Sequence, residues 1–241
     1  MFVIGSFFIM AHRKEECSLQ FRHEVKHEIS NLDMLILRQR LRAVMMPDVH
    51  AQEGRYEIRS LYFDNLDDKA LREKLDSVNI REKYRIRLYN HDPSLIRLER
   101  KFKNGGLGYK NLTLLTSEQA LAIVNGDIQW MAKSNDEVIL GFYSRILSDG
   151  LKAKVIVDYT REPFVFAPGN VRVTLDYQIR TALRCTDFLN PECTTIPIPG
   201  SPCILEVKWD NFLPDIIRDA VQLGNRHSQA FSKYAACRMY D

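Results

Sequence analysis

The sequence predicts an α+β fold in which an antiparallel sheet curls into a barrel flanked by helices. Eight segments alternate apolar and polar residues with the period of a β-strand. Most of them follow one another without a helix in between, as antiparallel strands do. In five of them, residues 21–29, 81–89, 96–103, 171–177 and 204–209, one face is largely apolar and the other largely ionic, so the sheet needs an apolar cover on one side only.

The predicted strands cover residues 21–29, 55–63, 81–89, 96–103, 110–115, 154–161, 171–177 and 204–209. Between the fourth and the fifth, Asn104-Gly105-Gly106 is typical of a hairpin turn, because asparagine and glycine accept positive φ angles. No internal repeat or Ser/Gly-rich linker divides the chain. We therefore expect a single domain over residues 21–241 and a poorly ordered N-terminal extension over residues 1–20.

Six segments are predicted to be helical: residues 32–46, 66–78, 117–124, 135–147, 214–223 and 228–239. The first has apolar residues at positions 34, 37, 41, 44 and 45 and ends before Pro47, which cannot continue a helix. Ser117 is the expected cap of the third, and the fourth begins after Ser134. Gly126 and Gly150 follow these two helices as C-terminal stops.

The ionic strand faces are rich in arginine and lysine. One face of residues 81–89 carries Arg81, Lys83, Arg85 and Arg87. A solvated sheet face is the ordinary explanation of charges at alternate positions. Neighbouring cations repel one another, however, and a water-poor interior tolerates several of them only around an anion. The alternative is a barrel with an ionic interior that binds a polyanion.

Composition excludes several other classes of protein. With 34 Lys and Arg against 31 Asp and Glu, the net charge of +3 is far from that of a polybasic protein. The five cysteines include no C-x-x-C, which indicates reduced thiols in a cytoplasmic protein and no zinc ribbon. The apolar run over residues 1–10 would extend only about 15 Å as a helix, so we expect no membrane span in this chain.

Two sequence patterns could indicate other functions, but each is better explained by the predicted strands. His23-Glu24-Val25-Lys26-His27 spells the zinc-protease motif H-E-x-x-H, which needs a helix to bring both histidines to one metal. On the predicted strand the two histidines would be ~13 Å apart. Aromatic residues on the strands are expected to pack in the barrel wall rather than to stack on bases, so no nucleic-acid partner is predicted.

Six short motifs, in order, resemble the VTC (vacuolar transporter chaperone) polyphosphate polymerase domain of the triphosphate tunnel metalloenzymes. They are Ser60-Leu-Tyr-Phe-Asp-Asn65, Arg85-Ile-Arg87-Leu-Tyr, Leu98-Glu-Arg-Lys101, Val171-Arg-Val-Thr-Leu-Asp176, Ile204-Leu-Glu-Val-Lys208 and Phe231-Ser-Lys233-Tyr. The resemblance implies an antiparallel tunnel barrel with a basic lumen. It also implies transfer of the terminal phosphoryl group of ATP to a polyphosphate chain with the help of Mn²⁺ or Mg²⁺.

The resemblance also implies roles for particular residues. Catalytic contacts to phosphates would come from Arg85, Arg87, Lys101, Arg161, Arg172 and Lys208. Further phosphate-binding residues would be Lys26, Lys103 and Lys233. Glu206 would hold the metal, with Glu24 and Glu99 as accessory acids. Phosphoryl transfer depends mainly on positioning and charge neutralisation, so the absence of an obvious Ser, Cys or His nucleophile is no obstacle.

One position departs from the pattern of the wider superfamily, E-x-E-x-K, because Arg22 stands where the first glutamate is expected. Losing a carboxylate favours the polymerase branch over a two-metal hydrolase. A tripolyphosphatase and a non-catalytic polyphosphate-binding module stay open as alternatives. The expected partners are ATP, triphosphate or polyphosphate in the cytoplasm, while a membrane partner, the oligomeric state and the natural status of residues 1–9 are left open.

Overall fold

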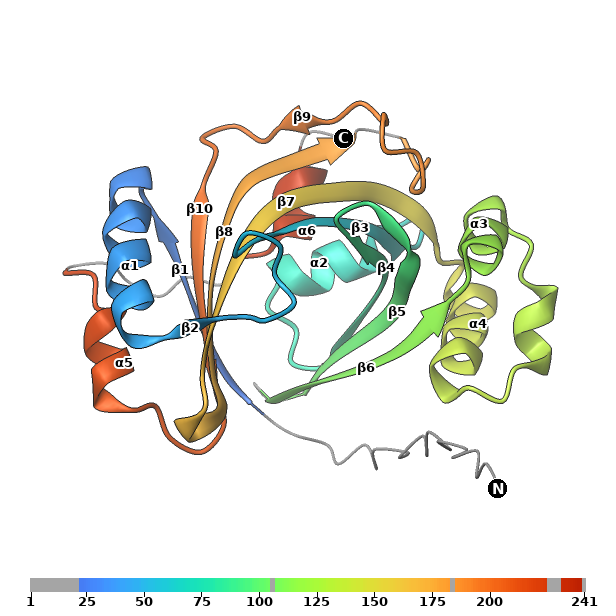
Figure 1. The fold of residues 1–241 in the computed structure, drawn as a ribbon. Helices are drawn as coiled ribbons and strands as arrows, with labels where there is room; N and C mark the ends of the chain where they lie inside the picture. The colour runs from blue at the N-terminus through green and yellow to red at the C-terminus, as the bar shows by residue number, and fades with distance from the viewer. Residues whose placement is uncertain (1–21, 105–106, 183–184, 225–230, 240–241) are drawn as a thin grey trace, which may run out of the picture.

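The computed structural model describes residues 22–104, 107–182, 185–224 and 231–239. Within these residues, ten strands form one antiparallel sheet in the order β1-β10-β8-β7-β3-β4-β5-β6, with β2 paired to β7 and β9 to β8. The sheet curls strongly into a half-barrel whose two edges are β1 and β6 (Figure 1). The predicted α+β class and the antiparallel tunnel architecture are confirmed.

The strands run over β1 (His23–Ile29), β2 (Met46–Pro47), β3 (Tyr56–Asp64), β4 (Arg81–Tyr89), β5 (Asp92–Asn104), β6 (Leu107–Leu115), β7 (Lys152–Phe166), β8 (Val171–Ala182), β9 (Ile196–Pro197) and β10 (Cys203–Trp209). The α-helices are α1 (Asn31–Val44), α2 (Lys69–Leu75), α3 (Ser117–Asn125), α4 (Glu137–Asp149), α5 (Asp215–Ala220) and α6 (Lys233–Arg238). Two short 3-10 helices are η1 (Gln129–Lys133) and η2 (Pro168–Asn170). None of the described helices is long and apolar enough to cross a membrane.

Helices cover the outer face of the sheet in two places. Phe142 of α4 stacks on Tyr84 of β4, with ring centroids 4.7 Å apart, in a cluster that α3 completes. On the other side, Leu37 of α1 packs with Leu175 of β8 and Leu205 of β10. Each fully buried aliphatic or aromatic side chain of this kind stabilises the fold by about 1.5–3 kcal/mol. The apolar faces of β4, β5, β8 and β10 therefore point outward under the helices, as their alternation predicts.

A third cluster lies inside the curve of the sheet, where Figure 1 shows α6 beside α2. Ile58 and Tyr62 of β3 and Val157 of β7 meet Tyr234 of α6 there. These residues alternate along their strands with residues of the outer clusters, so they point inward. The inner face of the sheet is thus apolar where α6 covers it, and it carries ionic side chains elsewhere.

Several predicted boundaries were wrong. The helix predicted over 66–78 covers only Lys69–Leu75, because Asp68 takes a left-handed backbone conformation just before it. The cap of α3 is Thr116 rather than Ser117, and that of α4 is Asp136. The last helix begins at Lys233, while residues 228–230 lie outside the described part of the chain.

The predicted hairpin after Asn104 is supported by its flanking strands. β5 and β6 pair antiparallel up to Asn104 and Leu107, while Gly105 and Gly106 themselves are not described. The predicted N-terminal extension and Cys17 also lie outside the described residues. The other four cysteines are free thiols.

Candidate functional site

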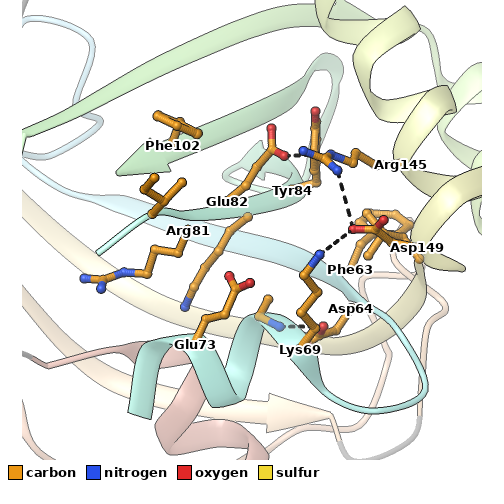
Figure 2. A pocket seen from close by; sticks show the side chains of 14 residues that line it. Phe63, Asp64, Lys69, Glu73, Arg81, Glu82, Tyr84, Phe102, Arg145 and Asp149 are labelled. Carbon is orange, nitrogen blue, oxygen red and sulfur yellow. Dashed lines mark hydrogen bonds and ion pairs between the residues drawn. The ribbon is translucent and has the colours of Figure 1, made fainter. Parts of the chain in front are cut away.

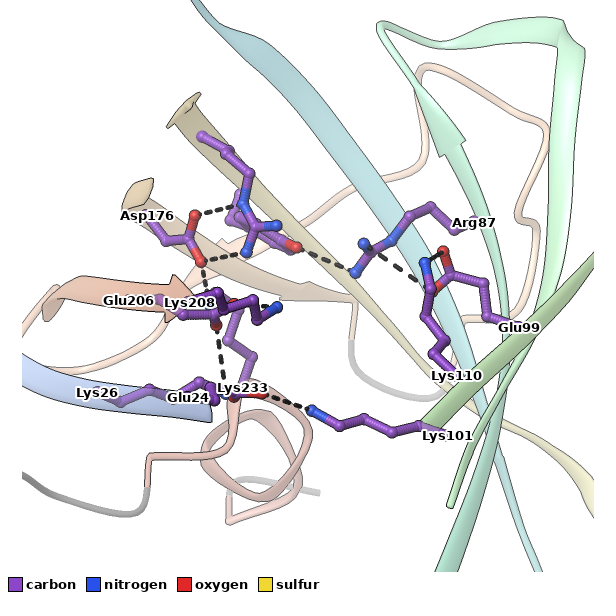
Figure 3. Close-up of polar contacts among 12 residues, drawn as sticks. Glu24, Lys26, Arg87, Glu99, Lys101, Lys110, Asp176, Glu206, Lys208 and Lys233 are labelled. Atoms are coloured by element: carbon purple, nitrogen blue, oxygen red, sulfur yellow. Dashed lines mark hydrogen bonds and ion pairs between the residues drawn. The ribbon is translucent and has the colours of Figure 1, made fainter. Parts of the chain in front are cut away.

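Strand register brings the predicted site residues onto the inner face of the half-barrel. Directly paired residues of antiparallel strands project from the same face of a sheet. Lys26 of β1 pairs with Glu206 of β10, and Glu24 with Lys208. On the opposite wall, Arg85 of β4 pairs with Glu99 of β5. Because the sheet curls, these two walls face each other across the interior (Figure 3).

The first group of contacts joins β1 and β10. The ammonium group of Lys26 contacts the carboxylate of Glu24 and lies 3.3 Å from Oε2 of Glu206. Lys208 contacts the other oxygen of Glu206. Burial alone would raise the pKa of Glu206, but Lys208 and Lys26 hold it well below its usual range. Burial and Glu206 also oppose ionisation of Glu24, whose pKa nevertheless falls to about 2 beside the lysines.

The second group centres on Asp176 of β8, whose side chain is fully buried. Nε of Arg161 lies 2.6 Å from Oδ1 and Nη2 lies 2.7 Å from Oδ2, so the contact is bidentate. Lys233 of α6 adds an ion pair of 2.5 Å to Oδ2. Burial acts to raise the pKa of Asp176, yet Arg161 and Lys233 lower it to about 2. The short helix α6 thus contributes the side chain of Lys233 to a site whose other residues lie on strands.

The third group surrounds Glu99, which is only 1% exposed. Arg85 donates to it at 2.7 Å and Lys110 of β6 at 3.1 Å. Burial acts to raise the pKa of Glu99, but Arg85, Arg87 and Lys110 hold it well below its usual range. The carboxylate therefore stays ionised inside the protein.

Arg87 is held in place by two neutral groups. Its Nε donates to Oγ of Ser60 and its Nη2 to the hydroxyl of Tyr159, both at 3.0 Å. Its Nη1 is 4.0 Å from Glu99. Since neutral oxygens do not cancel its charge, Arg87 keeps most of its capacity to attract an anion.

One ion pair crosses the open side of the half-barrel. Lys101 of β5 donates to Oε2 of Glu24 of β1 at 3.2 Å, although the two strands are not neighbours in the sheet (Figure 3). Burial and the charge of Lys26 lower the pKa of Lys101 to about 8. Side chains, rather than backbone hydrogen bonds, thus complete the circumference of the tunnel between β1 and β5.

The structure gathers most of the predicted site residues and places two of them at the margin. Those gathered are Lys26, Arg85, Arg87, Lys101, Arg161, Lys208 and Lys233, with Glu24, Glu99 and Glu206. Arg172 is in register with Lys208 and lies on the same face, but its ion pair is with Asp48, outside the strands, at 3.0 Å. Lys103 lies at the end of β5, opposite Gly108 of β6. The phosphate-binding and metal-binding roles of all these residues remain predictions.

Three contributors to the inner wall were missed by the sequence prediction. Asp176 stands on a predicted ionic strand face, so the parity of its strand was the available signal. Lys110 shares its face with Leu112 and Leu114, and only its pairing with Lys101 places it on the inner wall. Tyr159 was missed because an aromatic residue in a strand is ordinarily core. Its ring lies 5.5 Å from the guanidinium of Arg161 and 4.6 Å from the amine of Lys233.

The zinc-protease interpretation is excluded because the H-E-x-x-H residues lie on a strand and not on a helix. Residues 23–27 lie on β1, and His23 stacks on Trp209 with ring centroids 5.3 Å apart. No group of three or more His, Cys, Asp or Glu residues in the described part of the chain is arranged to hold a metal ion by itself.

The curled antiparallel sheet with facing cationic walls has the architecture that the sequence motifs led us to expect. The VTC domain family matches residues 21–240, so the chain belongs to this family. Among solved structures, a candidate adenylyl cyclase from Hippeastrum with a dominant triphosphatase activity superposes with a TM-score of 0.57 at 13% identity, over 91% of this chain and 96% of that chain. This likeness shows the fold.

Two further structural matches are more distant in shape. A candidate adenylate cyclase from Bacillus halodurans has a TM-score of 0.49 at 15% identity, over 78% of this chain and 80% of that one. A protein from Pyrococcus horikoshii has a TM-score of 0.48 at 14% identity, over 91% and 99%. No curated protein matched the sequence.

Proposed function

We propose that this protein is a metal-dependent polyphosphate polymerase, which transfers the terminal phosphoryl group of ATP to a polyphosphate chain. The observation that carries the proposal is the excess of cations on the inner wall. Eight arginine and lysine side chains surround only four carboxylates there: Lys26, Arg85, Arg87, Lys101, Lys110, Arg161, Lys208 and Lys233 around Glu24, Glu99, Asp176 and Glu206. Buried charge without a counterion is costly, so the wall is suited to a polyanion.

The chemistry needs positioning more than covalent help. The bond between the γ-phosphorus and the β–γ bridging oxygen breaks, a terminal oxygen of the chain forms the new bond, and ADP leaves. A terminal phosphate has a second pKa of about 6, so the acceptor oxygen is already an anion near neutral pH and needs no general base. Arg85 and Arg87 present planar donors to phosphate oxygens, and Lys208 adds a point charge.

A divalent cation fits Glu206 and Glu24. Both carboxylates stay ionised and both contact the ammonium group of Lys26, which places them close together. Mg²⁺ and Mn²⁺ prefer oxygen ligands, and Mg²⁺ is commonly held by one or two carboxylates together with substrate phosphates and water. When bound, the ion would neutralise charge on neighbouring phosphate oxygens, with Glu206 as its main protein ligand and Glu99 supporting the arginines.

Product analysis tests the proposal. Purified protein is incubated with ATP and Mn²⁺, and acid-insoluble polyphosphate and free phosphate are measured together. We expect chains to accumulate, and we expect Arg87→Ala, Lys208→Ala and Glu206→Ala to lose at least about 100-fold in rate. Arg42→Ala, on the exposed side of α1, is the matched control and should keep the wild-type rate. Wild-type synthesis by Arg87→Ala and Lys208→Ala would refute the assignment.

A tripolyphosphatase is the second candidate, in which water replaces the chain as acceptor. The triphosphatase activity of the Hippeastrum protein favours it. Against it, Arg22 supplies no carboxylate and instead pairs with Asp210 at 2.7 Å. Free phosphate without chains in the same assay would select the hydrolase, and binding without either product would select a polyphosphate-binding module.

A further inference from the structure

Two cysteine side chains lie in contact on the outer side of the sheet, away from the ionic inner wall. Cys185 follows β8, and Cys193 comes eight residues later, before β9. Their Sγ atoms are 3.0 Å apart, and both cysteines are free thiols. The other cysteines of the described residues, Cys203 and Cys237, each contact an oxygen atom instead. Cys185 and Cys193 are called the thiol pair below.

The thiol pair lies at the edge of the apolar cluster that α3 and α4 cover. Cys193 is 9% exposed and belongs to this cluster, whereas Cys185 is half-buried and packs against it. Figure 2 shows two other members of the cluster, Phe63 and Tyr84. One sulfur is therefore enclosed by packed side chains, and the other is partly open to a small molecule in solvent.

Hydrogen bonds hold the turn between the two sulfurs. The backbone amide of Cys193 donates to the carbonyl of Asn190 at 3.1 Å, and the amide of Glu192 donates to Oδ1 of Asn190 at 3.0 Å. Nδ2 of Asn190 donates to Oδ2 of Asp187 at 2.9 Å. Nη1 of Arg59 on β3 donates to the same carbonyl as Cys193. These contacts order the turn before any bond forms, so joining the sulfurs costs little further conformational entropy.

The distance between the sulfurs distinguishes a pair of thiols from a metal site. Two thiolates that share one zinc ion lie ~3.8 Å apart, because each Zn–S bond is ~2.3 Å long and the angle between them is tetrahedral. The separation of 3.0 Å between Cys185 and Cys193 is shorter. No group of three possible metal ligands in the described part of the chain includes them. The contact therefore favours chemistry between the two sulfurs.

We propose that the thiol pair is a redox modification site, at which hydrogen peroxide converts Cys185 and Cys193 into a reversible intrachain disulfide. The thiolate of Cys185 attacks one peroxide oxygen, the O–O bond breaks, and the leaving hydroxide takes up the proton that Cys185 has lost. Cys193 then attacks the sulfur of the resulting sulfenic acid, and its proton leaves with the displaced hydroxide as water. Two thiols lose two electrons in total, and one peroxide becomes two water molecules. A small-molecule thiol restores the pair by disulfide exchange.

The two sulfurs have different roles in this reaction. Burial raises the pKa of the Cys193 thiol to about 12, so this sulfur is protonated at neutral pH and is a poor first nucleophile. Cys185 is the more exposed of the two, and peroxide reaches it first. Cys193 instead resolves the sulfenic acid, since the two sulfurs are already in contact.

Oxidation would hold the turn closed against β3. Arg59 binds the carbonyl of Asn190 in this turn and both carboxylate oxygens of Asp158 on β7. The backbone amide of Cys193 donates to Asn190 as well, so it exchanges with solvent only when the turn opens. We expect this amide to exchange hydrogen at least about tenfold more slowly in the oxidised protein than in the reduced protein.

Thiol counting with and without hydrogen peroxide tests the site. All proteins carry Cys17→Ser, so that the four cysteines of the described residues are the ones counted. We expect peroxide to lower the count from four to two and reduced glutathione to restore it. Proteolytic cleavage before Asp187 separates Cys185 from Cys193, so a linked pair of peptides identifies the bond by mass spectrometry.

Matched variants separate the thiol pair from a general oxidation of cysteines. Cys193→Ala should form no disulfide, and dimedone should label a sulfenic acid at Cys185 in its place. The control is Cys203→Ala, which removes another buried thiol and should still form the bond between Cys185 and Cys193 at the wild-type rate.

Two results would overturn the modification site: a wild-type count that stays at four in peroxide, or a disulfide that joins other cysteines or two chains. Equal exchange of the Cys193 amide in the oxidised and reduced proteins would overturn the closure of the turn. None of these measurements involves ATP or polyphosphate, so their outcome is independent of the polymerase assignment.

Discussion

Asp176 illustrates how single residues keep charge inside this protein. It is completely buried, yet a bidentate arginine and a lysine contact its two oxygens. Glu99 and Glu206 are held in the same manner by other cations. Removing one partner of such a group leaves the other charge buried alone, which is why these contacts affect stability strongly.

The depressed pKa of Asp176 predicts an acid-sensitive contribution to stability. Its folded pKa of about 2 lies below the ordinary value of about 4, so the contribution is complete above about pH 4 and is lost as pH falls towards 2. Urea unfolding from pH 7 to 2 should show Asp176→Asn less stable than wild type by about 2 kcal/mol or more near neutral pH. The gap should close in acid, and a gap that stays constant with pH would contradict the prediction.

Arg87 predicts a difference between arginine and lysine. Its guanidinium contacts Ser60 and Tyr159 at the same time, which an ammonium group on a flexible stem does not reproduce. Arg87→Lys should therefore lower the rate of ATP turnover by about 10- to 100-fold, whereas Arg42→Lys leaves it unchanged. Steady-state kinetics checks this, and full activity in Arg87→Lys would show that charge alone is sufficient.

Secondary structure elements were predictable where their own residues decide them. The alternation in residues 81–89 corresponds to β4, and the pattern before Pro47 corresponds to α1. The start of α2 was not predictable, because it depends on the left-handed backbone of Asp68 and on Asp64 at the end of β3, whose carboxylate accepts from the first backbone amides of the helix. The two-residue strands β2 and β9 are too short to show a period.

Tyr234 of α6 is linked to α2 through a shared carboxylate, Asp64. Its hydroxyl donates to Oδ2 of Asp64 at 2.6 Å, and the same carboxylate binds the backbone of α2. Tyr234→Phe should lower the free energy of unfolding by about 1–2 kcal/mol while the ring still stacks on Tyr62. Urea denaturation measures this change.

A second variant shows whether the coupling is real. In a double-mutant cycle, Tyr234→Phe should have a smaller effect in an Asp64→Asn background, because the acceptor is then altered. Additive effects would mean that α2 and α6 dock independently.

At the scale of the whole molecule, the curl of the sheet decides which charges meet. The sequence indicates that Lys101 and Glu24 lie on ionic strand faces, but not that β5 and β1 approach each other across the open side. That contact depends on the accumulated twist of the intervening strands. The inner charges were therefore predictable as a set, whereas their partners required the three-dimensional structure.

The ion pair across the open side predicts two separable effects. Lys101→Met and Glu24→Gln should both speed hydrogen exchange of β1 amides, since each removes the link between β1 and β5. Only Lys101→Met should weaken metal-free tripolyphosphate binding, by about tenfold, because Glu24→Gln removes a negative charge instead of a positive one. Unchanged exchange in both variants would mean that the ion pair does not hold the open side.

In a closed barrel, strand number and stagger fix the radius. Here the ladder of backbone hydrogen bonds stops at β1 and β6, and the last step around the ring is made by long, rotatable side chains. Rotation of the Lys101 and Glu24 side chains can consequently change the width of the tunnel between β1 and β5 without breaking a strand pair.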